Sequence, residues 1–133
     1  CDPGGRVYLQ RRALSKDCSP GLWDTSASGH VLAGEDYDAC ARREITEELG
    51  LTGFDLSPCL FKLPAHPDTG NEFVCVYRVT TAATIRPDPA EISAGDWYVP
   101  AAIDAWLAAR PDELTATFRQ IWARLDRTAA PPA

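Results

Sequence analysis

Methionine is absent from this sequence of 133 residues, and histidine occurs only twice. Because the chain opens on Cys1 instead of an initiator methionine, we expect its N-terminus to be trimmed. The segment Asp2-Pro3-Gly4-Gly5 has the composition of a turn and directly precedes an apolar stretch, as in the middle of a hairpin. An earlier strand is therefore expected upstream of the numbered residues.

Long apolar runs are also missing. No stretch reaches the length needed to cross a bilayer, and no signal-peptide pattern opens the chain. The five cysteines are odd in number and form no CxxC pair, which favours reduced thiols over a disulfide framework or a zinc site. Together these absences predict a cytoplasmic protein with no membrane partner.

Positive charge is scarce, because 13 Lys and Arg residues face 19 Asp and Glu residues, for a formal net charge of −6. A broad nucleic-acid-binding surface needs a basic footprint, so nucleic acid is not expected as a partner. A phosphorylated substrate would still need local positive charge, from arginine or from a bound metal. Arg11 and Arg12 are therefore candidate substrate-binding residues, although a solvated pair is an equally good interpretation.

The residues that are present fit one compact domain over positions 1–133. Helices are expected over 36–49, 100–109 and 112–125, and strands over 7–10, within 54–63, over 73–80 and over 97–99. The segment 88–95 is expected to be a loop. Strands on both sides of a central helix, followed by two terminal helices, predict an α/β fold with a mixed β-sheet sandwiched between α-helices.

The first expected helix carries three glutamates on one face. Glu44, Glu47 and Glu48 stand at i, i+3 and i+4, so their carboxylates project within about one turn of each other. An acidic, solvated helix face is the plain interpretation. Magnesium, however, prefers hard oxygen ligands and commonly binds through a few carboxylates together with substrate phosphates. The spacing therefore makes this face a candidate metal site.

The surrounding residues carry a longer pattern. From Gly29 to Leu51 the sequence matches G-x5-E-x7-R-E-U-x-E-E-x-G-U, with U an aliphatic residue, at every specified position. This string resembles the Nudix box, and chance is a poor explanation for a match at every specified position. The resemblance implies the Nudix fold and a hydrolase that cuts a phosphoric anhydride bond with Mg²⁺, or with Mn²⁺ in its place.

The resemblance also implies roles for individual residues. It places metal on Glu44 and Glu48, with Glu47 as a further ligand or as the general base, and a backbone carbonyl near Gly29 completing the site. Arg43 would orient the glutamates by pairing with them, supported by Glu35. Outside the box, Glu91 is either an extra metal ligand or an ordinary loop carboxylate, and Trp23 or Trp97 either packs in the core or stacks on a base.

Three functions stay open at this point. The first is hydrolysis of a diphosphate linkage in a nucleoside diphosphate or triphosphate, or in another nucleoside-diphosphate-linked compound. The second follows from a further resemblance, carried by residues 9–16, 20–24 and 28–30, to type I isopentenyl-diphosphate isomerase, in which a cysteine stands where this chain has Ser28. The third is a catalytically silent binding module, although such modules typically lose box glutamates that are all present here. A small phosphorylated molecule is the expected partner, and a homodimer is left open.

Overall fold

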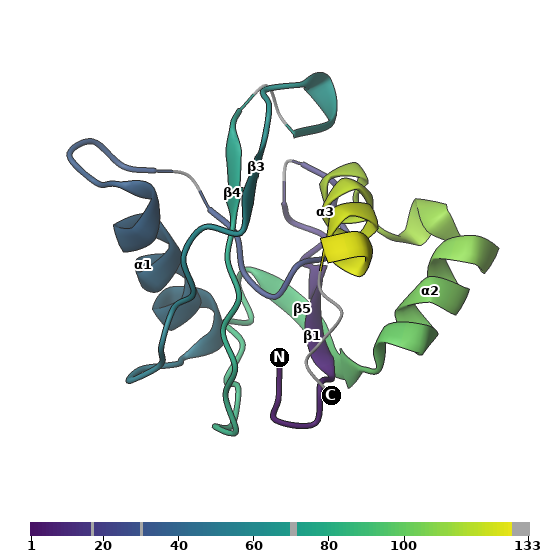
Figure 1. The fold of residues 1–133 in the computed structure, drawn as a ribbon, viewed down its shortest axis with the longest axis horizontal. Helices are drawn as coiled ribbons and strands as arrows, with labels where there is room; N and C mark the ends of the chain where they lie inside the picture. Colours follow the sequence, from purple (N-terminus) through teal and green to yellow (C-terminus); the bar gives the residue numbers. More distant parts are fainter. Residues whose placement is uncertain (17, 30, 70–71, 129–133) are drawn as a thin grey trace.

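The computed structural model describes residues 1–16, 18–29, 31–69 and 72–128, and Figure 1 shows their arrangement. Helix α1 lies on one side of the strands, while helices α2 and α3 lie on the other side. The described elements are, in chain order, β1 (Val7–Arg12), β2 (Trp23–Asp24), α1 (Tyr37–Leu49), β3 (Phe61–Leu63), η1 (Pro67–Thr69), β4 (Val74–Val76), β5 (Ile92–Tyr98), α2 (Pro100–Ala109), η2 (Pro111–Glu113) and α3 (Ala116–Thr128). Strands between helices confirm the expected α/β class.

The first sheet has the strand order β2-β1-β5, and both of its ladders are antiparallel. Strand β5 corrects the expectation of a loop over 88–95, because it begins at Ile92 and pairs with β1 from Ile92 to Tyr98, with one register irregularity between Arg11 and Arg12. Residues 93–96 read Ser-Ala-Gly-Asp, which has little intrinsic preference for strands, so the edge of β1 supplies the hydrogen bonds that define this one. At Gly95 an added Cβ would lie 1.8 Å from the Tyr8 hydroxyl oxygen, so a larger residue would collide there.

The second sheet joins β3 and β4 in antiparallel register. The strand expected over 73–80 is shorter than predicted, because regular pairing stops after Val76 and only an isolated bridge joins Leu56 and Val79. Next to this bridge the backbone of Cys1 bonds to residues 79 and 81. One N–H donates to the Val79 carbonyl at 2.7 Å, and the Cys1 carbonyl accepts from Thr81 at 2.9 Å.

The alternation of side chains along β1 places its residues in two different clusters of the hydrophobic core. Leu9 packs with buried residues of the two C-terminal helices and the segment between them, namely Ile103, Leu114, Phe118 and Trp122. Tyr8, on the opposite face, packs with Leu49, Leu51 and Ile92. Burying one such side chain contributes roughly 1.5–3 kcal/mol. Hydrophobic side chains therefore pack on both faces of the first sheet, and α1 packs on the face that carries Tyr8 and Gln10.

Local signals set the ends of α1, as the sequence predicts. Asp36 is the N-cap, and its carboxylate accepts a hydrogen bond from the Ala39 N–H at 2.7 Å. Gly50 ends the helix in the left-handed region at φ 66°, and its N–H donates to the Thr46 carbonyl. A Cβ at Gly50 would also lie 3.1 Å from the Cβ of Arg86, so glycine suits both the backbone and the packing.

The last helix begins later than expected. The sequence predicts a helix over 112–125, but 111–113 form η2 and α3 starts at Ala116. Between them Leu114 bridges to Trp23, and the Thr115 N–H donates to the Trp23 carbonyl at 2.9 Å. The Thr115 hydroxyl then accepts from the Phe118 N–H at 3.1 Å, which caps the helix. A contact with β2, distant in sequence, therefore decides this boundary.

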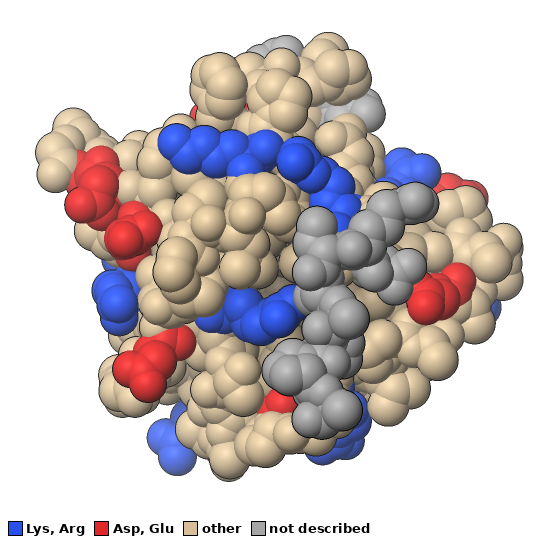
Figure 2. All heavy atoms as spheres, in the orientation of Figure 1, with Lys and Arg blue, Asp and Glu red and all other residues tan. Residues whose placement is uncertain are grey.

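Charge is unevenly spread over the surface. In Figure 2 basic side chains form a band across the upper part of the visible face, in a chain whose net charge is −6. Two basic residues lie on aromatic rings, with Lys62 Nζ 5.1 Å from the Tyr37 centroid and Arg124 Cζ 4.6 Å from that of Phe61. No helix within the described ranges is long and apolar enough to cross a membrane.

Candidate active site

Glu44 of α1 lies directly against the loop that precedes the helix. An ideal Cβ at Gly29 would lie 2.1 Å from Glu44 Cδ and 2.3 Å from its Oε1. No residue with a side chain can occupy this position unless the glutamate moves away. Glycine is needed here for close approach, and the fold thus brings together two box residues that are 15 positions apart in the chain.

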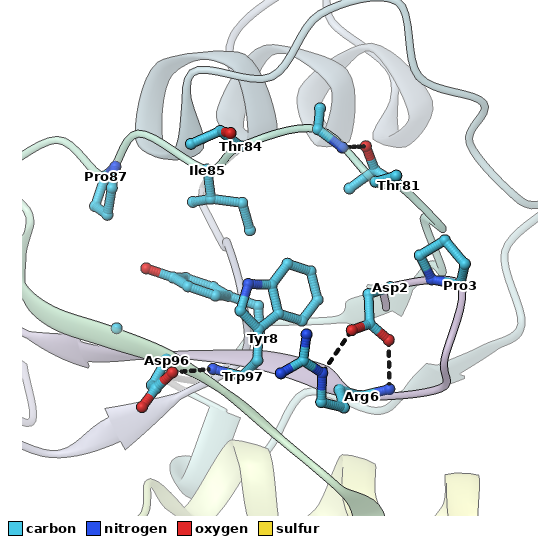
Figure 3. A pocket seen from close by; sticks show the side chains of 13 residues that line it. Asp2, Pro3, Arg6, Tyr8, Thr81, Thr84, Ile85, Pro87, Asp96 and Trp97 are labelled. Carbon is cyan, nitrogen blue, oxygen red and sulfur yellow. Dashed lines mark hydrogen bonds and ion pairs between the residues drawn. The ribbon is translucent and has the colours of Figure 1, made fainter.

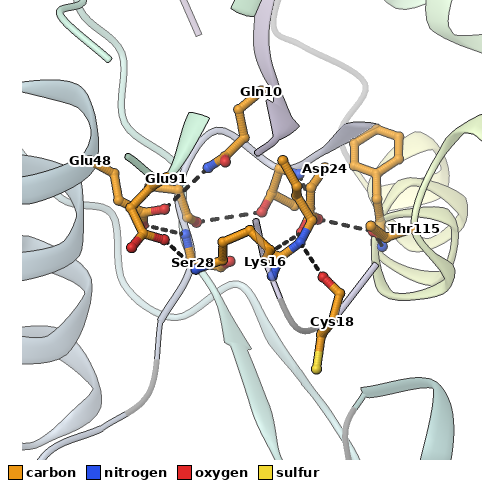
Figure 4. Close-up of polar contacts among 12 residues, drawn as sticks. Gln10, Lys16, Cys18, Asp24, Ser28, Glu48, Glu91 and Thr115 are labelled. Atoms are coloured by element: carbon orange, nitrogen blue, oxygen red, sulfur yellow. Dashed lines mark hydrogen bonds and ion pairs between the residues drawn. The ribbon is translucent and has the colours of Figure 1, made fainter. Parts of the chain in front are cut away.

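Glu48 is buried, and the donors that contact it among the described residues are uncharged. Its carboxylate accepts from the Ser28 N–H at 3.0 Å and from the Gln10 side-chain amide at 3.4 Å, as Figure 4 shows. Burial is the largest cause that raises the pKa of Glu48 to about 8. The nearby Glu44 carboxylate acts in the same direction, while the bonds from Gln10 and Ser28 lower the pKa. In the absence of a cation, the neutral form of Glu48 is therefore favoured in the folded protein at neutral pH.

Arg43 binds three carboxylates at once. Its Nε and Nη2 contact the two oxygens of Glu35 at 2.8 and 3.1 Å, which is the side-on, bidentate geometry. Its Nη1 contacts Glu44 at 2.6 Å and Glu47 at 3.1 Å. The hydrogen bond from Arg43 is the largest cause that lowers the pKa of Glu35 to about 2. Glu35 therefore stays ionised and anchors Arg43, which in turn orients Glu44.

In the arrangement seen here, the oxygen atoms around Glu44 and Glu48 supply only some of the ligands that a hard divalent cation needs. Within the described ranges, no group of three or more His, Cys, Asp or Glu side chains lies close enough together to hold a metal ion. The side chain of Glu47 is 58% exposed and bonded to Arg43. Two neighbouring carboxylates remain, one of them buried, with the backbone of Gly29 beside them. Oxygen ligands of this kind are the ones that magnesium prefers.

The basic residues near the end of β1 are already engaged. Arg11 Nε donates to the Gly21 carbonyl at 2.9 Å, and Arg12 Nε donates to the Cys18 carbonyl at 2.9 Å. Arg12 also forms an ion pair with Asp24 at 3.5 Å. Beside them, Lys16 forms an ion pair with Glu91, drawn in Figure 4. Glu91 therefore faces a lysine in this structure, although its loop is tied to α1 through the bond from the Asp88 N–H to the Glu48 carbonyl at 2.8 Å.

The sequence alone does not predict the contacts that three residues make in this network. Gln10 and Ser28 supply the bonds to Glu48, and Asp24 is buried between Arg12 and Thr115, with its pKa raised chiefly by burial. Gln10 carries one available signal, since a polar residue in an apolar strand needs a partner when it is buried. Ser28 acts through its backbone N–H, which no side-chain pattern can reveal.

A comparison with protein-family models identifies the fold that holds this network. The model described as NUDIX domain matches residues 1–118. The chain belongs to the Nudix family. The resemblance of the sequence to the Nudix box is thereby confirmed, and the site around Glu44 and Glu48 is the part of the Nudix domain that the box forms.

Nudix relatives of two kinds are similar to this chain. An isopentenyl-diphosphate Delta-isomerase of Rhodobacter capsulatus is 34% identical over 84% of this chain and 67% of its own length. A Nudix hydrolase of Deinococcus radiodurans is 36% identical over 79% of this chain and 62% of its own length. The chain thus spans about two thirds of the length of these curated relatives.

Solved Nudix structures agree with the fold. A crystal structure of a Deinococcus radiodurans protein has a TM-score of 0.81 at 30% identity and covers 92% of this chain and 76% of its own. A MutT protein from Methanosarcina mazei has a TM-score of 0.76 at 22% identity, over 98% of this chain and 89% of its own, and therefore speaks for the fold alone. The family model, the Nudix hydrolase relative and the 30% identical structure support an enzyme that hydrolyses phosphoric anhydrides.

Proposed function

We propose that this Nudix domain hydrolyses the diphosphate linkage of a nucleoside diphosphate or triphosphate, or of another nucleoside-diphosphate-linked compound, with Mg²⁺ held by Glu44 and Glu48. Mn²⁺ is the alternative ion. The observation that carries the proposal is the pairing of two carboxylates, Glu44 against Gly29 and Glu48 buried without an ion pair to any described residue. A divalent cation would replace this electrostatic conflict with attraction.

When bound, the cation supplies neutralisation of phosphate charge and a lower pKa for a coordinated water. The residues of the chain have separate tasks. Gln10 and the Ser28 N–H hold Glu48 in place, and the Glu35–Arg43 pair holds Glu44. Glu47 is the most exposed of the three glutamates, and it would accept a proton from the attacking water once its ion pair with Arg43 opens. Glu91 is a further ligand if Lys16 releases it.

Positive charge for the substrate phosphates would come from the end of β1. Arg11 and Arg12 stay candidates for this task, but each guanidinium is partly occupied by a backbone carbonyl. Lys16, which pairs with Glu91, would supply a further positive charge in the same region. A small phosphorylated molecule suits this arrangement better than nucleic acid, because the overall charge is −6.

The test is a panel of nucleoside diphosphates, nucleoside triphosphates, nucleotide sugars and dinucleotides, incubated with MgCl₂ in ¹⁸O-labelled water. We expect the label to appear in a phosphate-bearing product of at least one compound. EDTA should abolish the reaction, and Glu48→Gln should reduce it. Absence of cleavage across the panel at saturating magnesium would refute the proposal.

The isomerase is the second candidate, because several relatives that are 34–37% identical carry that name. The N–H of Ser28 donates to Glu48, so a side chain at this position stands beside the candidate site. Isomerisation needs an acid and a base on opposite faces of an alkene, and a serine hydroxyl is a far weaker acid than a thiol. Incorporation of solvent deuterium into isopentenyl diphosphate, with no nucleotide cleaved, would establish the isomerase instead.

A further inference from the structure

Two thiols meet on the second sheet, outside the box. Cys75 lies in β4 and Cys59 just before β3, the two strands that run side by side in Figure 1. Both cysteines are half-buried, and the five cysteines of the chain, all of them among the described residues, are free. Figure 3 shows a pocket of about 620 Å³ that is lined by residues of β1, β5 and the segments 2–6 and 81–87. Neither thiol lines this pocket, so the pair is separate from it.

An irregularity in the second sheet brings Cys59 to the face that carries Cys75. Lys62 is the ladder partner of Cys75, so a regular strand would place Cys59, three residues before Lys62, on the opposite face of the sheet. The pairing is not regular, because residues 57–60 on one side lie opposite only residues 77–78 on the other. Extra residues of this kind change the direction of the side chains they carry. The bulge therefore explains how the two thiols come into contact.

The two thiols form a short chain of hydrogen bonds. The Cys59 S–H donates to the Phe61 carbonyl at 3.3 Å, and the Cys75 thiol forms a hydrogen bond with that of Cys59. Burial is the largest cause that raises the pKa of Cys75 to about 11, and the hydrogen bond with Cys59 acts in the same direction. The charge of the nearby Lys62 lowers this pKa. Cys75 thus has a second thiol in contact and a cation beside it, which distinguishes it from an isolated structural cysteine.

Tyr77 links the thiol pair to helix α1. Its hydroxyl donates to Asp38, in the first turn of α1, at 2.5 Å. Burial is the largest cause that raises the pKa of Tyr77, followed by Asp38, and Cys75 and Cys59 act in the same direction. Tyr77 therefore lies close to both sulfurs. A bond between the two sulfurs would tie the start of β3 to the segment that makes this contact with α1.

We propose that Cys59 and Cys75 are a redox site, which a peroxide converts to a reversible intramolecular disulfide. One thiol, after losing its proton, attacks the peroxide, so that its sulfur becomes a sulfenic acid and the first water leaves. The other thiolate then attacks the sulfenic sulfur and displaces its oxygen as a second water. Two thiols and one H₂O₂ thus give one disulfide and two waters. The site is independent of the proposed hydrolysis, because neither cysteine belongs to the box.

The test is oxidation of the whole reduced chain with H₂O₂ at pH 8.5 in EDTA, followed by alkylation of the remaining thiols in denaturant and digestion with trypsin. Cleavage after Arg43, Lys62 and Arg78 places Cys59 in peptide 44–62 and Cys75 in peptide 63–78, with no other cysteine in either. We expect the two peptides to appear joined, at about 2 Da below the sum of their reduced masses. Two of the five thiols should be lost, and dithiothreitol should restore them.

Cys59→Ser and Cys75→Ser should each abolish the two-thiol loss within one chain. Cys18→Ser is the matched control, because Cys18 is exposed and the variant should form the same joined peptides as the parent. The joined peptides in the parent and in Cys18→Ser, from protein that runs as a monomer on a non-reducing gel, support the proposal. Their absence at excess peroxide, a link from either cysteine mainly to Cys18, or a link between two chains would each overturn it. The peptide map of the parent decides the outcome even if a variant fails to fold.

Discussion

Replacing Glu48 by Gln should stabilise the metal-free protein at alkaline pH, while it harms catalysis. Burial raises the pKa of Glu48 from 4.5 to about 8. The pKa of Glu48 in the folded state lies above the unfolded value. The free energy of unfolding is therefore highest below pH 4.5, where Glu48 is protonated in both states, and falls as the pH rises to about 8. Gln is uncharged throughout this window, so the variant avoids that loss.

The rise of the Glu48 pKa from 4.5 to about 8 sets an upper limit of about 5 kcal/mol on the free energy of unfolding that is lost when Glu48 ionises. The carboxamide of Gln presents one acceptor oxygen instead of two to Gln10 and the Ser28 N–H, which costs roughly 1–3 kcal/mol of this gain. We therefore expect the free energy of unfolding of Glu48→Gln to exceed that of the parent by at most about 2–4 kcal/mol at pH 8.5. At pH 4.5 the difference should vanish or reverse.

The assay is urea unfolding of both proteins between pH 4.5 and 8.5 in EDTA, followed by circular dichroism. Glu47→Gln is the matched control, because the Glu47 side chain is 58% exposed and should show no such pH trend. Magnesium should stabilise the parent at pH 8.5 and have a much smaller effect on Glu48→Gln. The reasoning is wrong if the stability of the parent, relative to the variant, does not fall between pH 5 and pH 8.

Three further predictions concern catalysis. Glu44→Gln and Glu48→Gln should each lower turnover by at least about a hundredfold in a folded protein, measured with magnesium on the best substrate of the panel, and near-parental activity would contradict the ligand set. Gly29→Ala should reduce turnover and weaken activation by magnesium, because its Cβ would lie 2.1 Å from Glu44 Cδ. Gly4→Ala is the control, because its Cβ would meet only Asp2 Oδ1 at 3.5 Å and its φ is not in the left-handed region. Replacing all five cysteines by Ala or Ser should leave the chemical step largely intact, because the thiols form no disulfide and the sequence has no CxxC pair. Loss of turnover in Cys40→Ser alone, with a normal melting curve, would count against this last expectation.

The sequence by itself determined the features that depend on neighbouring residues. Helix α1 could be predicted closely, because Asp36 and Gly50 fix its ends through local hydrogen bonds and backbone geometry. The box spacing also indicated the family and the candidate glutamates, since a helical repeat places Glu44 and Glu48 one turn apart. None of these inferences needed a contact between distant segments.

Only the tertiary structure decided the features that depend on distant segments. Strand β5 exists because β1 offers it an edge, and α3 begins at Ala116 because Leu114 and Thr115 pair with Trp23. The difference between three glutamates of one helix was also hidden from the sequence. Glu48 is buried because α1 packs on the face of β1 that carries Tyr8 and Gln10, while Glu47 stays exposed on the same helix. A carboxylate takes its pKa from the dielectric and the partners around it, and these are properties of the folded chain.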